Sequence, residues 1–384
     1  MSGRGLVLWR SGDKEPPVVA RIAIAGDFLP AGKLELPGSD SWNDAARRLA
    51  PYFEDVATTF VNLECSIDSG GLTPRKLVGL GNIVTAPPEA LHYLAAIRAV
   101  AVGFANNHAY DFGDAGVDRT RQALARLNLS LIGAGRVTTD APEVYIWRGP
   151  GSIMVGFWAA AKASYDRADN RHAGTEPATL GRAKQALGLI RSSGASFSIA
   201  LLHAGAIRAS RPDPGDMKLM DAMATAGFDV VAASHSHRIS GSKCPHTGRG
   251  RPAFCFYGLG SLASGYIGSP MEREGLVVVA GLKSCGGLGS LEVKPVSLTA
   301  SGFGEAPSAE VSRTILDRFR QLSAEIADGS SKRVFYREIS QNLIRLYLRD
   351  ARAAFSESGI GGLARKAWRI RLRHLRRLAH GILL

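Results

Sequence analysis

Residues 105–113 read ANNHAYDFG, and this stretch decides how the rest of the chain is interpreted. The apolar run Val100–Ala105 leads directly into two asparagines and a histidine, and a helix-like segment follows at 114–127. This order is typical of a buried strand whose carboxyl end carries reactive groups. Asn107 offers an amide oxygen as a metal ligand, and His108 a neighbouring imidazole.

The same order recurs along the chain. Four more apolar runs, rich in Val, Ile and Phe, read as buried strands: Arg21–Ala25, Thr59–Leu63, Phe197–Leu202 and Phe228–Ala232. They lead into Asp27, Glu64, His203, and the pair His235 and His237. Amphipathic helices are expected between them, at 88–98, 179–192 and 216–226, and further strands at 253–262 and 275–282. This alternation predicts a layered α/β fold, in which the polar residues after the strands share one site.

These residue types suit a centre of two divalent cations. Such a centre needs carboxylates to offset charge, imidazoles as borderline ligands, and an oxygen donor that bridges the metals. Asp27 is expected on the first metal and Glu64 as the bridge, with Asn107, His203, His235 and His237 as further ligands of Mn, Fe, Zn or Mg. Each residue alone also fits a turn or a hydrogen-bonded strand end, and their succession at strand ends favours the metal site.

His108 is assigned a role other than metal binding. An imidazole beside a metal-bound Asn can protonate a leaving alkoxide as a general acid. Asp111 lies close enough in sequence to orient that ring. The structural alternative is a hydrogen bond within the loop 106–111.

Together these motifs resemble the bacterial capsule-synthesis proteins of the CapA type, which are linked to poly-γ-glutamate and assigned to the calcineurin-like metallophosphoesterases. The resemblance covers about residues 20–265. Besides ANNHAYDFG it rests on GDF at 26–28, NLE at 62–64, IGAG at 132–135, LLHAG at 201–205, ASHSHRISG at 233–241 and FYGLGSLAS at 256–264. It implies a metallophosphoesterase-like β-sandwich flanked by helices, over residues 18–300.

Several positions depart from the pattern of the relatives. Metallophosphoesterases begin with Asp-x-His, where this chain has Leu29, a lack shared by CapA-like proteins. Ile207 replaces a Glu that usually follows the His-x-Gly, and Ser261 replaces an Asn. A changed set of surrounding residues implies a different substrate or a weaker catalyst.

Three functions stay open. The first is a metal-dependent hydrolase, phosphoesterase-like, in capsule, exopolysaccharide or poly-γ-glutamate production. The second keeps the fold without turnover, as a binding or scaffold protein of a polymer synthesis complex, which Leu29 and Ile207 favour. The third is an amide hydrolase acting on glutamyl polymers with the same metals.

The chain is basic, with a formal net charge of +13, and the excess is concentrated at its end. After a Gly/Ser/Pro-rich linker at about 300–309, residues 310–384 are expected to form a helical extension. Within it, 363–384 hold seven Lys or Arg and no acidic residue, and apolar residues recur there at helical spacing. An anionic membrane surface is one expected partner; packing on the domain or on a second subunit, or a solvated tail, are the alternatives.

Partners and location follow from the same features. An anionic or phosphorylated polymer or precursor is expected, with a homo-oligomer or a synthase complex as further possibilities, and no DNA- or RNA-binding motif accompanies the charge. The four cysteines form no CxxC pair, and neither a secretory signal nor an apolar stretch of spanning length is evident. The expectation is a cytoplasmic protein, peripheral to the inner face of the membrane where it meets one.

Overall fold

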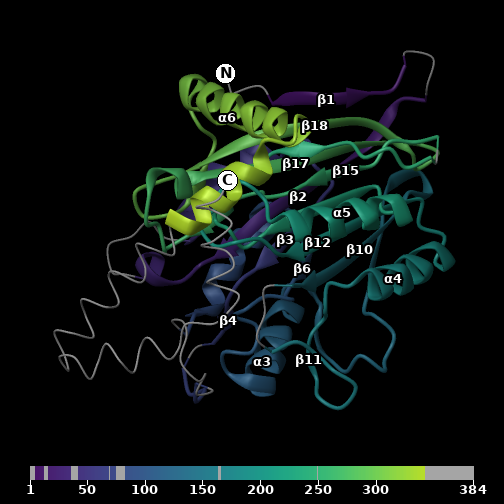
Figure 1. The fold of residues 1–384 in the computed structure, drawn as a ribbon. Coiled ribbons are helices and arrows are strands. Elements are labelled where there is room, and N and C mark those ends of the chain that lie inside the picture. Colours follow the sequence, from purple (N-terminus) through teal and green to yellow (C-terminus); the bar gives the residue numbers. More distant parts are fainter. Residues whose placement is uncertain are drawn as a thin grey trace.

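Two β-sheets face each other across an apolar layer, and helices cover their outer faces (Figure 1). The arrangement confirms the predicted α/β fold, a β-sandwich flanked by helices. The computed structural model describes residues 5–12, 16–35, 42–68, 70–74, 83–162, 166–248 and 250–341.

The first sheet has nine strands among the described residues. In spatial order they are β1 (Leu6–Arg10), β18 (Leu288–Leu298), β17 (Glu274–Lys283), β2 (Val18–Leu29), β3 (Thr58–Leu63), β6 (Ala99–Gly103) and β7 (Ser130–Ile132), with β16 (Ser261–Ser264) beside β2 and β19 (Gly304–Glu305) beside β18. The strands β2, β3, β6 and β7 run parallel, so their carboxyl ends lie at one edge.

The second sheet also has a parallel centre. Its order is β14 (Ser242–Lys243), β15 (Phe254–Phe256), β13 (Val230–Ser234), β12 (Phe197–His203), β10 (Met154–Ala161) and β9 (Tyr145–Arg148). The four strands β10, β12, β13 and β15 are parallel. Two small pairs lie outside the main sheets: β4 (Ser66–Ile67) with β5 (Thr85–Ala86), and β8 (Ala134–Arg136) with β11 (Gly174–Thr175).

The helices divide between the two outer faces. On the first sheet lie α1 (Trp42–Leu49), α2 (His92–Ala96) and α3 (Gly113–Ala125), and on the second lie α4 (Leu180–Ser192) and α5 (Pro214–Ala226). Short 3-10 helices are η1 (Gly32–Glu35), η2 (Ala50–Phe53), η3 (Pro88–Leu91), η4 (Pro150–Ser152) and η5 (Pro270–Arg273). Among the described residues, no helix is long and apolar enough to cross a membrane.

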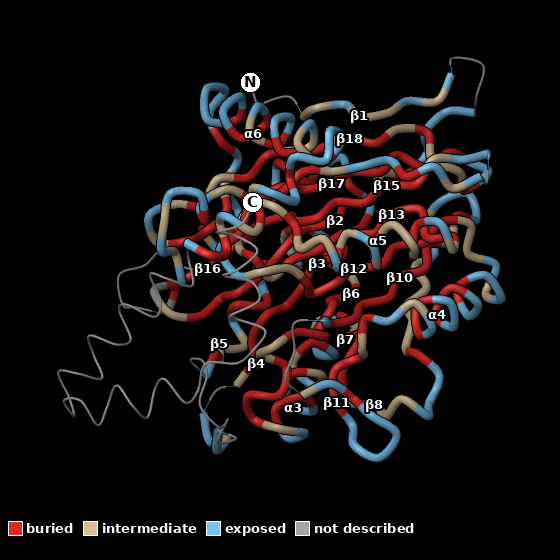
Figure 2. Tube along the Cα trace, viewed as in Figure 1, coloured by how far each residue is buried: buried red, intermediate tan, exposed pale blue. Residues whose placement is uncertain are grey.

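The central strands are buried on both faces, as Figure 2 shows along the middle of the molecule. Alternate residues of a strand point to opposite faces, so one strand supplies two cores. In β3, Phe60 enters the layer between the sheets and stacks on Phe157 of β10 at a ring-centroid distance of 4.7 Å. Its neighbour Val61 packs with the helices α1, α2 and α3 instead. This explains the continuous apolar runs of the sequence.

The helix α6 (Ala309–Ala327) covers the open side of the sandwich, over β14 and β18. The Ser308 hydroxyl caps it by accepting the Val311 N–H at 3.3 Å. Gly241 lets the segment before β14 lie close to the backbone of α6, because a Cβ at this position would lie 2.5 Å from the carbonyl carbon of Leu322. Four apolar side chains of α6 enter the layer between the sheets: Ile315, Leu316, Phe319 and Leu322.

Some expected elements differ from the observed ones. The run 253–262 is not one strand: β15 belongs to the second sheet and β16 to the first, and the chain crosses between them through Gly260, whose φ is +66°. The helix expected at 88–98 is split into η3 and α2. The linker expected at 300–309 contains β19 and the start of α6.

The C-terminal extension is described in part. Residues 331–341 are helical, and Phe335 and Ile339 pack on Ala209. Residues 342–384, with the basic segment 363–384, lie outside the described residues. The division into units at 18–300 and 310–384 stays a prediction.

We expect α6 to contribute to the stability of the sandwich. Phe319 is 1% exposed and stacks near Phe256, with ring centroids 6.5 Å apart. Phe319→Ala should lower the free energy of unfolding by about 3–5 kcal/mol, since it leaves a cavity between the sheets. Val311→Ala, on the exposed side of the same helix, should change it by less than about 0.5 kcal/mol. Equal denaturant midpoints for the two variants would contradict this packing.

Candidate metal centre

The side chains predicted to form a site converge at the carboxyl ends of both sheets. Asp27 lies near the end of β2 and Glu64 directly follows β3, while His203 ends β12. All three are buried, with exposures of 0%, 1% and 1%. Asn107 follows β6, and His235 and His237 follow β13. The edge where parallel strands end therefore holds the whole predicted set.

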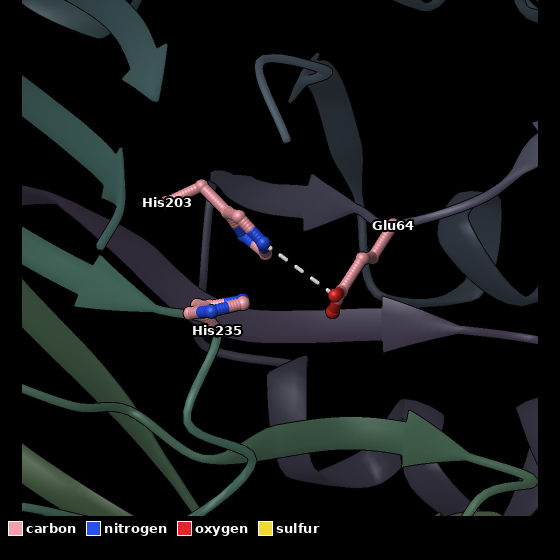
Figure 3. A group of neighbouring side chains, drawn as sticks. All are labelled: Glu64, His203 and His235. Carbon is pink, nitrogen blue, oxygen red and sulfur yellow. Dashed lines mark ion pairs between the residues drawn. The ribbon is translucent and has the colours of Figure 1, made fainter. Parts of the chain in front are cut away.

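Two groups of side chains offer ligand atoms that all lie within 4.8 Å of one another. One comprises Glu64, His203 and His235 (Figure 3), and the other Asp27, Glu64 and His237. In the first group, His203 Nε2 lies 3.5 Å from Glu64 Oε1. In the second, His237 Nδ1 lies 3.3 Å from Asp27 Oδ2 and 3.8 Å from Glu64 Oε2. Glu64 is common to both groups, which is the position of a bridging carboxylate.

Asn107 joins the first group through its side-chain oxygen. Its Oδ1 lies 2.5 Å from Nε2 of His203. The ring of His203 also lies against that of His235, with centroids 4.5 Å apart and planes at 61°. The first group thus combines a carboxylate, an amide oxygen and two imidazoles.

The donor set fits divalent cations. Glu64 Oε2 and His235 Nδ1 are buried and have no hydrogen-bond partner among the described residues. A buried polar atom left unpaired costs about 1–3 kcal/mol, and a cation would satisfy both atoms. Carboxylate, amide and imidazole together suit Mn, Fe, Zn or Mg. Asp27, Glu64, Asn107, His203, His235 and His237 are therefore the residues that would hold such ions.

The charges in the cluster are strongly coupled. Burial raises the pKa of Asp27, but the hydrogen bond and charge of His237 and the charge of His203 bring it below its usual range. Burial and the charge of Asp27 hold the pKa of Glu64 well above its usual range. Crowded carboxylates of this kind favour a cation between them.

The imidazoles differ in charge. Burial and the charge of neighbouring His235 hold the pKa of His203 well below its usual range. Burial, followed by the charge of His237, lowers the pKa of His235 to about 4. Burial acts to lower the pKa of His237 as well, but the charges of Glu64 and Asp27 outweigh the effect of burial and raise this pKa to about 9. His203 and His235 are therefore neutral at neutral pH, the form in which imidazole binds a metal, whereas a cation at the group of Asp27, Glu64 and His237 would have to displace the proton of His237.

A glycine fixes the approach to Asp27. A Cβ on Gly26 would lie 2.0 Å from the carbonyl oxygen of Gly260, so only glycine lets the segment before β16 cross here. The Asp27 N–H donates to the same carbonyl at 3.0 Å. The Gly-Asp pair seen in the sequence is thus a crossing point of the chain.

The turn that carries the two histidines has an uncommon backbone. His235 has a φ of +111° and His237 a φ of +56°, in the left-handed region that side chains disfavour. The turn is held by the His235 N–H, which donates to Asp27 Oδ2 at 3.0 Å, and by the Ser236 hydroxyl, which donates to the Arg238 carbonyl at 3.0 Å. Strained backbone of this kind concentrates at functional sites.

His108 and Asp111 are in contact, as expected from their spacing. His108 Nδ1 lies 2.9 Å from Asp111 Oδ2, and the same oxygen accepts the Val84 N–H at 2.8 Å. Asp111 is 1% exposed, while the side chain of His108 is 16% exposed. The carboxylate thus holds one nitrogen of the ring and leaves its other edge toward solvent.

Two asparagines at the site were quoted in the motifs without a role. Asn62 Nδ2 donates to Asp27 Oδ1 at 2.7 Å and lies 3.4 Å from His203 Nδ1. Asn106 Nδ2 donates to the Leu63 carbonyl at 2.6 Å, and its Oδ1 accepts the His108 N–H at 3.0 Å. The signal for Asn62 was its strand period: it precedes Glu64 by two residues and so shares its face.

The departures noted in the sequence have different surroundings. Leu29 is 3% exposed and packs among apolar residues of the first core. Its side chain therefore contributes no ligand where the phosphoesterase motif would have an imidazole. Ile207 is 58% exposed. Ser261 is buried, and its hydroxyl lies 3.5 Å from His237 Nδ1.

Comparison with known families supports the resemblance drawn from the motifs. The sequence matches the family described as bacterial capsule synthesis protein PGA_cap over residues 21–266, more than half of the chain. A search among curated proteins gave no match.

Several solved structures are similar in fold. The chain is 11% identical to NAD nucleotidase from Haemophilus influenzae, covering 79% of this chain and 56% of that chain with a TM-score of 0.42. It is 13% identical to a 5'-nucleotidase precursor from Thermus thermophilus, and the match covers 79% of this chain and 58% of that chain with a TM-score of 0.42. It is 13% identical to the calcineurin-like phosphoesterase YfkN from Bacillus subtilis, and the match covers 80% of this chain and 98% of that chain with a TM-score of 0.45. The chain thus spans less than two thirds of the length of the first two.

Because Glu64 belongs to both ligand groups, we expect its replacement to lower the metal content more than the replacement of a ligand that belongs to one group. Wild-type protein should bind about two divalent ions, and Glu64→Ala should lose both. His237→Ala should keep the ion of the group with His203 and His235, because that group does not include His237. Elemental analysis after dialysis measures this. His172→Ala, at an exposed loop histidine, is the control, and equal metal content in it and Glu64→Ala would exclude the assignment.

Proposed function

Since this chain belongs to the family of bacterial capsule synthesis proteins, we propose that it is a metal-dependent hydrolase acting on a phosphoester in the production of capsule, exopolysaccharide or poly-γ-glutamate. The observation that carries the proposal is the position of Glu64, which is common to two groups of potential ligands. Two cations bridged in this way are the arrangement that hydrolyses phosphoesters.

The chain's own residues would divide the work. The two groups around Glu64 would hold two divalent cations, which when bound would supply a nucleophile from water at neutral pH and offset charge on a phosphoryl group. Asn62 and the His235 N–H hold the Asp27 carboxylate from two sides, which fixes its direction. Asn107 approaches His203 from the other sheet and orders that edge of the centre.

His108 would act on the leaving group. Asp111 accepts from Nδ1 of His108, so Nε2 is the nitrogen that can exchange a proton with the substrate. The buried carboxylate keeps the ring in its orientation. A protonated His108 can therefore give its Nε2 proton to the departing alkoxide.

The alternative is a scaffold of a polymer synthesis complex that binds without turnover. Leu29 favours it, because an apolar side chain in the first core stands where phosphoesterases place an imidazole. Hydrolysis of a generic phosphoester by the metal-loaded protein would favour the hydrolase, and its absence would favour the scaffold. An amide hydrolase of glutamyl polymers would use the same residues and differ only in its substrate.

We expect His108→Ala to lower kcat for an aryl phosphate by about 10²- to 10⁴-fold while metal content stays unchanged, since the ring is proposed to donate a proton and bind no metal. Asp111→Asn should show a smaller loss. The assay is hydrolysis of p-nitrophenyl phosphate by protein loaded with Mn, Zn, Fe or Mg, with His172→Ala as the control. Fully metal-loaded protein without turnover would favour the scaffold.

We further propose an anionic membrane surface as a partner of residues 363–384, which lie outside the described residues. Each basic side chain near such a surface contributes about 1 kcal/mol. Replacing Arg369, Arg373, Arg376 and Arg377 by Gln should therefore weaken binding to phosphatidylglycerol vesicles by about a hundredfold or more. Sedimentation with neutral vesicles is the control, and equal pelleting of both proteins would remove this partner.

A further inference from the structure

The backbone of Arg208 is hydrogen-bonded directly to the turn between the two histidines. The Arg208 N–H donates to the carbonyl of Ser236 at 2.9 Å, and Ser236 lies between His235 and His237. Arg208 itself has a φ of +60°, so its side chain leaves the loop after β12 in a direction that ordinary backbone does not give. The loop after one strand and the turn after the next thus present Arg208 beside the candidate centre.

A buried carboxylate holds the Arg208 guanidinium in place. Arg208 Nε lies 3.3 Å from Oε1 of Glu272, which is 2% exposed. Glu272 also accepts the Gly268 N–H at 2.6 Å and the Ser269 hydroxyl at 3.1 Å, so its own position is fixed.

A second arginine in the same network faces groups of the protein, although its buried Nε has no hydrogen-bond partner among the described residues. The side chain of Arg238 is 11% exposed and lies 3.3 Å from Glu338, 3.7 Å from Glu272 and 3.4 Å from the Ser269 hydroxyl. The Arg208 side chain is 55% exposed, and its two Nη groups have no hydrogen-bond partner among the described residues. Arg238 therefore ties the loops together, while Arg208 keeps donors for a ligand.

We propose that Arg208 determines substrate specificity by binding a second anionic group, phosphate or carboxylate, next to the phosphoryl group held at the metal centre. The inference rests on the proposed function and narrows its substrate to a molecule with neighbouring anionic groups. A guanidinium donates a planar pair of N–H groups, which matches the oxygens of carboxylate and phosphate. Glu272 Oε1 lies 3.3 Å from Nε, and the side chain of Arg208 is 55% exposed, so the Nη groups remain open to a ligand.

The test compares three phosphonates that bind without being hydrolysed. Methylphosphonate carries one anionic group, methylenediphosphonate adds a second phosphonate, and phosphonoacetate adds a carboxylate. Isothermal titration of metal-loaded, full-length protein should show tighter binding of one or both two-anion probes. Arg208→Ala should reduce that preference by about ten- to a hundredfold and leave methylphosphonate unchanged, as charge-assisted hydrogen bonds of this kind contribute. The probe that loses more identifies the second group.

Two further variants separate recognition from charge and folding. Arg208→Lys keeps the charge without the planar pair and should retain only part of the preference. Gly268→Ala adds a Cβ only 2.6 Å from Arg208 Nη2, so it should displace the guanidinium and also reduce the preference. Arg320→Ala removes a similarly exposed arginine, paired with Asp317 on α6, and should change nothing.

The outcomes are distinguishable. An unchanged preference in Arg208→Ala would overturn the role of Arg208 and leave the hydrolase proposal standing. Equal binding of methylphosphonate by wild type and Glu64→Ala would instead show that the metal centre does not hold the first anion, and would overturn both proposals.

Discussion

The Asp27 carboxylate is the constraint on which the rest of the site depends. It is fully buried, and it accepts from Asn62 in its own sheet and from the His235 N–H of the other sheet. A buried charge without such partners is strongly destabilising, so the carboxyl ends of the two sheets must meet around it. The separation and register of the sheets at this edge follow from that requirement. The layer of Phe60 and Phe157 fills the space that the contact leaves behind.

The fold was predictable where both faces of a strand are buried. The runs before Glu64 and His203 are largely apolar and end at a polar residue, so their predicted bounds were close to those of β3 and β12. The run predicted at 21–25 was too short, because β2 extends from Val18 to Leu29 and includes Asp27. The strand β18 was not expected, because its outer face alternates with charged residues and it contains Pro295. The break of 253–262 was missed for another reason: an apolar run does not reveal that the chain changes sheets within it.

The candidate centre was predictable as a set of ligand types, less so as a geometry. The positions of polar residues after strands predicted which side chains would lie near Glu64, and the structure brings Glu64 into both ligand groups. The left-handed backbone of His235 depends on hydrogen bonds to residues distant in sequence, and no local pattern encodes it. Glu272 and Glu338 lie beyond residue 266, outside the family match, yet they brace the loops beside the centre. Such contacts are tertiary and follow only from the packing of the extension on the domain.

The crossing at Gly260 has a consequence for how the protein is made. The carbonyl that the Asp27 N–H meets, and the strands β16 and β17 that flank β2, are synthesised more than two hundred residues after Asp27. Contacts between such distant segments slow folding and leave strand edges open in the meantime. The first sheet thus stays incomplete until these later segments have been synthesised. The surroundings of Asp27 are therefore completed only after Gly260 has been synthesised.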